Sequence, residues 1–383
     1  MSTVEEIIKE RNEVRSDLLA LKKPKRLFMT VSFSMEAACQ YSGIDPKEAH
    51  YNLELYEKAY DKMCADVISD TQPSNNLRFP ATYQILGAKH WVVGSKGTMQ
   101  HPEIEVMRDD EYDEFIKAPY KTIVEKFLPR VCAALTKDPA HNALKLATAY
   151  GTYKNFTNGQ AAIGAKMRAK YGFVGGVANH QMVAAPFDFL SDQLRGFKGI
   201  TIDARRFPDK VKAAMEVILP LQLKLAKPAV PRPGLVASCP LHLAPYLNKK
   251  QFEELWWPTF ERMVLGLQDM GIGSSLFVED DWTRFTPWLE KLPNSTIMYM
   301  EYGDPKVFTE TIGKNHVFGG FYNPTITLMR SKEECIDEAK RLFDTCMKSD
   351  HFFFRFDRSV MDIKSVDMPK LLAVLEWVRN VKY

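Results

Sequence analysis

Short runs of β-type residues alternate with helical patterns along most of this 383-residue chain, and this alternation constrains its fold more than any other feature. The runs lie at residues 26–33, 65–70, 173–177, 199–203, 234–243, 275–279, 296–301, 316–321 and 351–356. Such alternation predicts a parallel sheet with helices outside it. Because α/β barrels of this length form a single unit, we predict the α/β class and a (β/α)8 TIM barrel.

The barrel is predicted to carry two additions. Residues 1–25 form a helical leader, and the barrel itself covers residues 26–383 as one domain. The pattern is irregular from about residue 71 to about residue 143, where residues 84–93 are typical of a hairpin or loop. We interpret this region as an insertion over the barrel mouth, and not as a second domain.

Composition excludes several classes of protein. The net charge of +3 comes without a basic stripe, which argues against nucleic-acid binding. No stretch of about 18 apolar residues predicts a membrane span. The first 21 residues are charged throughout, unlike the apolar core of a signal peptide. Six scattered cysteines indicate reduced thiols, so we expect a cytoplasmic protein.

Polar residues at the predicted strand ends are the candidates for chemistry, because barrel active sites form where strands run into helices. These residues are Asn179, His180, His242, Glu279, Asp280, Asp281, Glu301, Asn323 and Asp357. Most of them are carboxylates or imidazoles. By contrast, His316 begins its strand and is expected at the opposite, structural end.

A metal site is predicted from the acidic string EDD at residues 279–281, which follows the apolar run 276–278. Carboxylates held together are costly unless a cation neutralises them or some are protonated. A divalent metal removes that cost by coordinating them. With His242 and Glu301 on flanking strands, Glu279 gives a three-ligand site with an open position, and Zn²⁺ suits this mixture of nitrogen and oxygen best.

Each of these residues also has an ordinary structural explanation. Glu301 is equally explained as a helix cap or as the buried partner of an arginine, and His242 as a satisfied core histidine or one that contacts substrate. Cys239 and His242 have the spacing of a metal pair, but an offset of three on a strand places them on opposite faces. Only a bend at Pro240 would bring that pair together.

Several segments resemble one known family. They are FVGGV at 173–177, APFD at 185–188, LRG at 194–196, PYLNKKQFEELWWP at 245–258, GGFYNP at 319–324 and SKEE at 331–334. These segments are similar to those of uroporphyrinogen decarboxylase-like proteins, and the likeness extends from about residue 147 to the C-terminus and, more faintly, over the front of the chain. The resemblance implies the same barrel fold.

The resemblance favours one branch of this family. The decarboxylases carry a Met-Arg-Gln-Ala-Gly-Arg stretch that grips porphyrinogen carboxylates, whereas residues 31–36 here read VSFSME. The other branch comprises zinc-dependent methyltransferases that deliver a methyl group to a corrinoid protein. Its methanol- and methylamine-utilising members carry His-x-Cys where this chain has Phe277-Val278-Glu279. The chain looks more like the first methyltransferase of anaerobic aryl O-demethylases, whose metal site uses carboxylates and a histidine.

The resemblance implies transfer of a methyl group from a methoxylated aromatic compound to cobalt(I). The chain lacks the Asp-x-His-x-x-Gly box that would bind a corrinoid, so a partner corrinoid protein must supply it. A Lewis acid or a proton donor at the ether oxygen would stabilise the leaving phenolate.

Further residues near the predicted strand ends are assigned to the substrate. We predict that Asn179 and His180 hydrogen-bond a ring hydroxyl and that Asp188 orients His180. Apolar walls for the ring are expected from Phe187, Phe189, Trp282 and Tyr322, although each is also explained as ordinary core.

Two rival functions stay open at this point. One is a decarboxylase or lyase that acts on a carboxylated ring, for which Arg195, Arg205 and Arg206 are the available arginine cluster. The other is a non-catalytic barrel that binds a small methoxylated compound. Metal content separates the second rival from the methyltransferase, because a binding module needs no stoichiometric zinc.

Overall fold

Five parallel strands form the main sheet, in the order β3-β4-β5-β6-β7. Their bounds are β3 Leu235–Leu241, β4 Ile272–Asp281, β5 Ile297–Tyr302, β6 Val317–Gly320 and β7 Phe352–Phe353. The computed structural model describes residues 3–74, 78–135 and 138–381. Residues 1–2 of the predicted leader, and residues 75–77 and 136–137 of the predicted insertion, lie outside this part. Because sheet order follows chain order, the predicted alternation of strand and helix is confirmed for this half of the chain.

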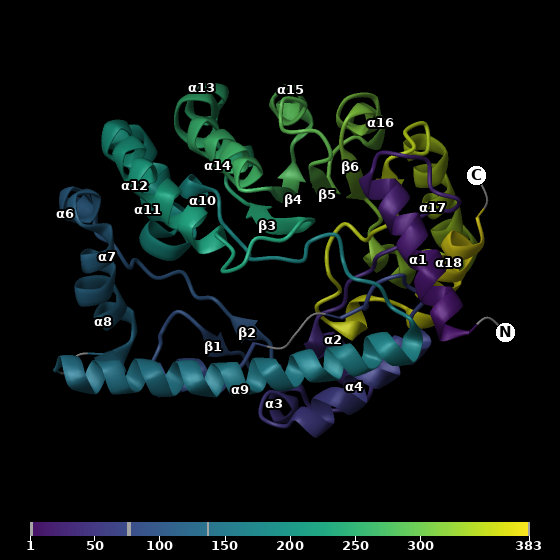
Figure 1. The fold of residues 1–383 in the computed structure, drawn as a ribbon, viewed down its shortest axis with the longest axis horizontal. Helices are drawn as coiled ribbons and strands as arrows, with labels where there is room; N and C mark the ends of the chain where they lie inside the picture. The colour runs from purple at the N-terminus through teal and green to yellow at the C-terminus, as the bar shows by residue number, and fades with distance from the viewer. Residues whose placement is uncertain (1–2, 75–77, 136–137, 382–383) are drawn as a thin grey trace.

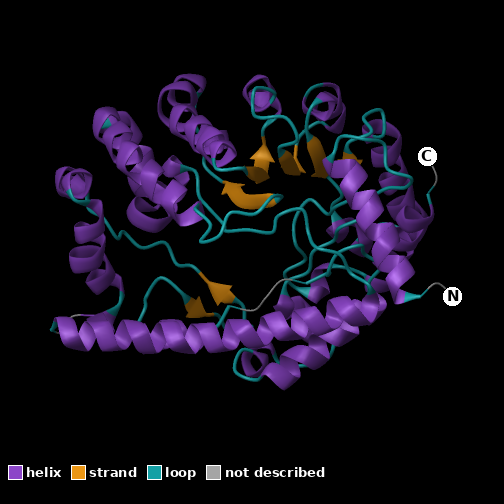
Figure 2. Cartoon of the chain, in the orientation of Figure 1, coloured by secondary structure: helices purple, strands orange, loops and turns teal. Residues whose placement is uncertain are grey.

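Helices lie on the outside of the sheet (Figure 1, Figure 2). Their bounds are α1 Val4–Leu19, α2 Met35–Tyr41, α3 Pro46–Ala49, α4 Leu53–Asp66, α5 Pro80–Leu86, α6 Tyr112–Lys117, α7 Pro119–Thr122, α8 Leu128–Val131, α9 Pro139–Tyr171, α10 Pro186–Phe189, α11 Gly196–Arg206, α12 Pro208–Ala226, α13 Lys249–Gln251, α14 Trp257–Asp269, α15 Thr286–Leu289, α16 Pro305–Glu310, α17 Lys332–Cys346 and α18 Met368–Asn380. None of the helices in the described residues combines the length and apolar character that crossing a membrane requires.

Single parallel bridges continue the pairing beyond both edges of the sheet. The bridged pairs are Met29 with Phe354, Phe33 with Ser74, Thr71 with Val174, and Met182 with Ser238. They follow a path from β7 through residues 28–33, 71–74 and 173–183 back to β3. Among the described residues, however, regular strands form only the five-stranded sheet and a short hairpin, so a closed eight-stranded barrel is not shown.

One predicted strand is a helix. Residues 199–203 lie within α11, where Ile200, Asp203 and Ala204 are buried at spacings of three and four residues. That spacing places them on one helical face. A short apolar run is compatible with either a strand or a buried helix segment, and the local pattern alone did not separate the two.

The predicted insertion contains short helices and a two-stranded hairpin. Strand β1 (Val92–Val93) pairs antiparallel with β2 (Met99–Gln100). In the chain, α5 precedes this hairpin and α6, α7 and α8 follow it. The long helix α9 then runs along the side of the molecule opposite α13 to α16 (Figure 1). Ion pairs from Lys166 to Glu57 and from Lys170 to Asp61 fasten α9 to α4.

A buried carboxylate ties the start of the chain to its end. Asp70 is fully buried and accepts hydrogen bonds from both terminal nitrogens of Arg26, each at 2.8 Å, and from Arg379 of α18 at 2.7 Å. The guanidinium of Arg11, on α1, lies 3.3 Å from the same carboxylate. Three arginines from separate segments therefore share one buried carboxylate, and Glu10 of α1 also pairs with Arg26 and Arg379.

Candidate active site at the carboxyl ends of β3 and β4

His242 lies immediately beyond β3 and contacts three carboxylates. Its ring Nδ1 is 2.8 Å from Oδ2 of Asp192, and its Nε2 is 3.3 Å from Oε1 of Glu279. Its backbone N–H donates a hydrogen bond of 2.8 Å to Oδ2 of Asp188. The structure thus brings together His242 and Glu279, two of the three predicted metal ligands.

The sheet register explains why these two side chains meet. Leu241 of β3 pairs with Val278 of β4, so the residue after each one emerges at the same edge of the parallel sheet. His242 and Glu279 are those residues. Asp192 reaches the same place from a π-helical turn at Leu190–Arg195 that follows α10. Such π turns are rare and frequently occur at functional sites.

The charges around His242 favour a cation at this position. Burial lowers the pKa of His242, but the hydrogen bonds to Asp192 and Glu279 and their negative charges outweigh it and raise the pKa to about 11. Without another cation, the imidazole therefore carries a proton between two carboxylates. This proton already balances the two carboxylates, and a metal ion bound to Nε2 would have to displace it, because histidine binds metals in its neutral form.

Asp188 holds the backbone at the end of β3. It is fully buried, and its second oxygen accepts a hydrogen bond of 2.7 Å from the indole N–H of Trp256. Burial raises the pKa of Asp188 to about 7. The prediction that Asp188 orients His180 is wrong, because Asp188 bonds to His242 and Trp256, while the ring of His180 contacts the carbonyl of Ala226. Asp188 is a positioning residue for the turn that carries His242.

Glu301 does not join the other two predicted metal ligands. One of its oxygens accepts the backbone N–H of Asp280 at 2.7 Å, and the other lies 3.4 Å from the guanidinium of Arg358. Within the described ranges, no group of three or more His, Cys, Asp and Glu side chains is arranged to hold a metal ion. The pair His242 and Glu279 suits zinc by ligand type and supplies two of the three protein ligands that catalytic zinc sites use.

Asn179 and His180 lie at the wrong end of the sheet for catalysis. Asn179 donates to the carbonyl of Gly234 at 2.8 Å and accepts from the N–H of Val236 at 3.0 Å, and His180 contacts the carbonyl of Ala226 at 2.6 Å. These partners lie before or at the start of β3, whereas His242 follows its end. The predicted substrate contacts are therefore wrong, because residues 179–183 run alongside β3 and do not end a strand there.

The predicted aromatic walls are core residues. Phe187, Trp282 and Tyr322 are at most 1% exposed. The indole N–H of Trp282 donates to the carbonyl of Glu279 at 2.9 Å, and the hydroxyl of Tyr322 donates to the carbonyl of Cys335. Trp282 therefore supports the strand end that presents Glu279, but none of the three is free to face a substrate.

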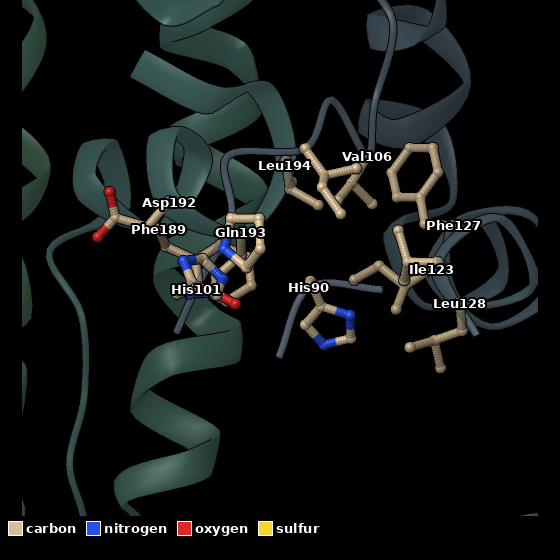
Figure 3. A pocket seen from close by; sticks show the side chains of 13 residues that line it. His90, His101, Val106, Ile123, Phe127, Leu128, Phe189, Asp192, Gln193 and Leu194 are labelled. Atoms are coloured by element: carbon tan, nitrogen blue, oxygen red, sulfur yellow. The ribbon is translucent and has the colours of Figure 1, made fainter. Parts of the chain in front are cut away.

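A cavity of about 170 Å³ lies beside Asp192, and sequence reasoning missed most of its lining (Figure 3). The wall on one side comes from the segment at residues 189–194, and the other walls come from the insertion. Phe189 was predicted as an apolar wall and does line it. The sequence of the insertion does not indicate which of its residues line the cavity, because its pattern is too irregular to show which side chains face one another.

Comparisons with known proteins add little to this geometry. No family model matches the chain, and no curated protein matches it. Among solved structures, it is similar to a B12-independent methionine synthase from Shewanella sp. W3-18-1 in complex with selenomethionine, with 13% identity and a TM-score of 0.33. The match covers 52% of this chain and only 60% of that protein. A likeness this distant carries no argument about function.

Proposed function

We propose that this chain is a zinc-dependent methyltransferase with a (β/α)8 barrel of the uroporphyrinogen decarboxylase type. It would move a methyl group from a methoxylated aromatic compound to the cobalt(I) of a separate corrinoid protein. The arrangement that carries the proposal is His242, oriented by Asp192 on Nδ1 and facing Glu279 with Nε2. The chain of parallel bridges from β7 back to β3 supports the barrel.

The residues divide the work as follows. His242 and Glu279 would hold the metal, and the bound Zn²⁺ supplies a Lewis acid for the ether oxygen. Asp192 fixes the tautomer and the ring orientation of His242, as carboxylates behind metal-binding histidines commonly do. Asp188 fixes the backbone of the same residue. Glu301 is left out of the ligand set, because Arg358 and the N–H of Asp280 already occupy its two oxygens.

The arginine cluster does not favour the rival lyase. Arg195 is buried, its Nε lies 2.5 Å from Asp203, and its terminal nitrogen lies 2.6 Å from Glu105. Its charge is therefore already neutralised within the fold. Arg205 and Arg206 are exposed at the C-terminal end of α11, and neither contacts His242 or Glu279. A carboxylated ring would find no free arginine beside His242 among these three.

The proposal predicts a specific pattern of methyl donors. The protein is mixed with a corrinoid protein in the cobalt(I) state and with methoxyaromatics, methanol, methylamines or thioethers, and formation of methyl-cobalt is followed by absorbance. We expect turnover with methoxyaromatics alone. Turnover only with another donor would overturn the substrate class, and silence with every donor would contradict methyl transfer.

A further inference from the structure

The cavity beside Asp192 has the size of a single aromatic ring. Its volume is about 170 Å³. A buried cavity of roughly 150 Å³ with apolar walls is known to hold one benzene molecule. The space therefore suits one ring with a small substituent.

The walls of the cavity are mainly apolar. Val106, Ile123 and Phe127 come from the insertion, and Phe189 lies across the cavity from Ile123 and Phe127 (Figure 3). Leu194 lies beside Val106, whose N–H its carbonyl accepts at 2.9 Å. Pockets for small organic ligands combine such walls with a few polar groups that set orientation. None of the described residues that line the cavity is a lysine or an arginine. An anionic ligand would therefore find no countercharge here.

One residue of the lining, His90, carries a buried polar atom. Nδ1 of His90 is shielded from solvent and has no hydrogen-bond partner among the described residues. Burying a polar atom without a hydrogen bond costs folding free energy, so unbonded buried polar atoms are rare in native structures and call for an explanation. Burial also lowers the pKa of His90, so its imidazole is neutral at neutral pH. A neutral imidazole pairs well with a hydroxyl or an ether oxygen.

The acidic residue on the lining does not change this preference. One oxygen of Asp192 is already bonded to Nδ1 of His242, and Figure 3 shows its carboxylate directed away from His90 and Phe127. Asp192 would therefore stabilise a cationic amine in the cavity less than an unpaired carboxylate would. An anionic ligand would find no positively charged partner on the lining, and a cationic ligand would find only a carboxylate that is already paired.

We propose that this cavity binds a neutral, single-ring aromatic molecule that carries a hydroxyl or ether group. On the proposed function, on which this second part rests, the occupant is the methyl donor: its ring lies in the cavity beside Asp192, and its methoxy group must extend past this residue to the Nε2 side of His242, because neither His242 nor Glu279 lines the cavity. The cavity would then select neutral methoxyphenols over methoxybenzoates.

Direct binding tests the ligand class without any methyl transfer. Binding of 2-methoxyphenol, 3-methoxybenzoate and 3-methoxybenzylamine to the full chain is measured by isothermal titration calorimetry at neutral pH. We expect 2-methoxyphenol to bind at least about tenfold more tightly than either charged compound, a difference of about 1.4 kcal/mol. Equal or tighter binding of a charged compound, or no binding of 2-methoxyphenol, would overturn the proposal.

A pair of matched variants tests the location. Ile104 lines the cavity, whereas Ile116 is a half-buried isoleucine in the same insertion that does not line it. Ile104→Phe should weaken 2-methoxyphenol at least about tenfold because the larger side chain fills the space, and Ile116→Phe should leave binding unchanged. If Ile104→Phe fails to fold, Ile104→Ala replaces it and should enlarge the space enough to admit 2-methoxynaphthalene. Equal effects at the two positions would place the ligand elsewhere.

The two proposals fail in different ways. Tight binding of 2-methoxyphenol that Ile104→Phe abolishes, together with no methyl-cobalt formation, keeps the cavity and contradicts the methyltransferase. Methyl transfer from methoxyaromatics that Ile104→Phe leaves unchanged keeps the methyltransferase and contradicts the cavity.

Discussion

Replacing His242 with alanine is expected to reduce methyl transfer to cobalt(I) by about 10³-fold or more. A Lewis acid contributes several kcal/mol to a reaction of this kind, and each 1.4 kcal/mol is about a factor of ten in rate. His242→Ala removes the nitrogen ligand and leaves Asp192 and Glu279 without their shared partner. The measurement is kcat/KM for methyl-cobalt formation with a methoxyaromatic donor.

Two further variants show whether that loss is specific. Asp192→Asn should reduce kcat/KM by about 10- to 100-fold, the range seen when an outer carboxylate behind a metal-binding histidine is lost. His141→Ala, a change of the same kind near the start of α9, should have no effect. The assignment of His242 fails if His242→Ala retains activity within a few-fold of the wild type, or if His141→Ala is equally damaged.

Replacing Asp70 with asparagine is expected to lower the free energy of unfolding by about 3–5 kcal/mol, the usual cost of removing one partner from a buried ion pair. The variant keeps the size of the side chain but leaves Arg11, Arg26 and Arg379 without their shared negative charge. Because these arginines lie on α1, on the segment beside β7 and on α18, the loss should affect cooperative unfolding of the whole chain. Urea denaturation monitored by circular dichroism measures it.

Asp66→Asn is the matched control for Asp70→Asn. Asp66 ends α4, four residues earlier, and forms a partly exposed pair with Lys62 at 2.8 Å. Pairs of this kind contribute about 0.3–0.5 kcal/mol. Similar losses in the two variants would mean that the buried cluster contributes no more to stability than a surface pair.

Elements with a clear local hydrophobic pattern are predictable from the sequence, and elements with a short or irregular pattern are not. The strands β3 to β7 are bounded apolar runs separated by amphipathic helices, and each was predicted close to its observed place. Residues 199–203 were assigned to the wrong type of element because a five-residue run is too short to show a helical period. The buried Asp70 cluster joins residues far apart in sequence, so no local pattern indicates it.

The site was predictable only where strand register decides it. His242 and Glu279 follow paired positions of adjacent parallel strands, so placing polar residues at strand ends was enough to bring them together. Asp192 was missed because a π-helical turn shifts it into place, and nothing in its sequence indicates that turn. Glu301 is at a strand end, but its carboxylate pairs with Arg358, which is 57 residues away in sequence, so no local pattern indicates the pair. Partnership with an arginine is one of the two structural explanations that the sequence leaves open for Glu301.

Metal content tests the central claim most directly. The protein and two variants, Glu279→Gln and Glu301→Gln, are purified without chelators, and zinc is measured by inductively coupled plasma mass spectrometry. We expect about one zinc ion per chain in the wild type and in Glu301→Gln, and little or none in Glu279→Gln, because the metal needs the carboxylate that faces His242. Full zinc occupancy in Glu279→Gln, or its loss in Glu301→Gln alone, would contradict the account.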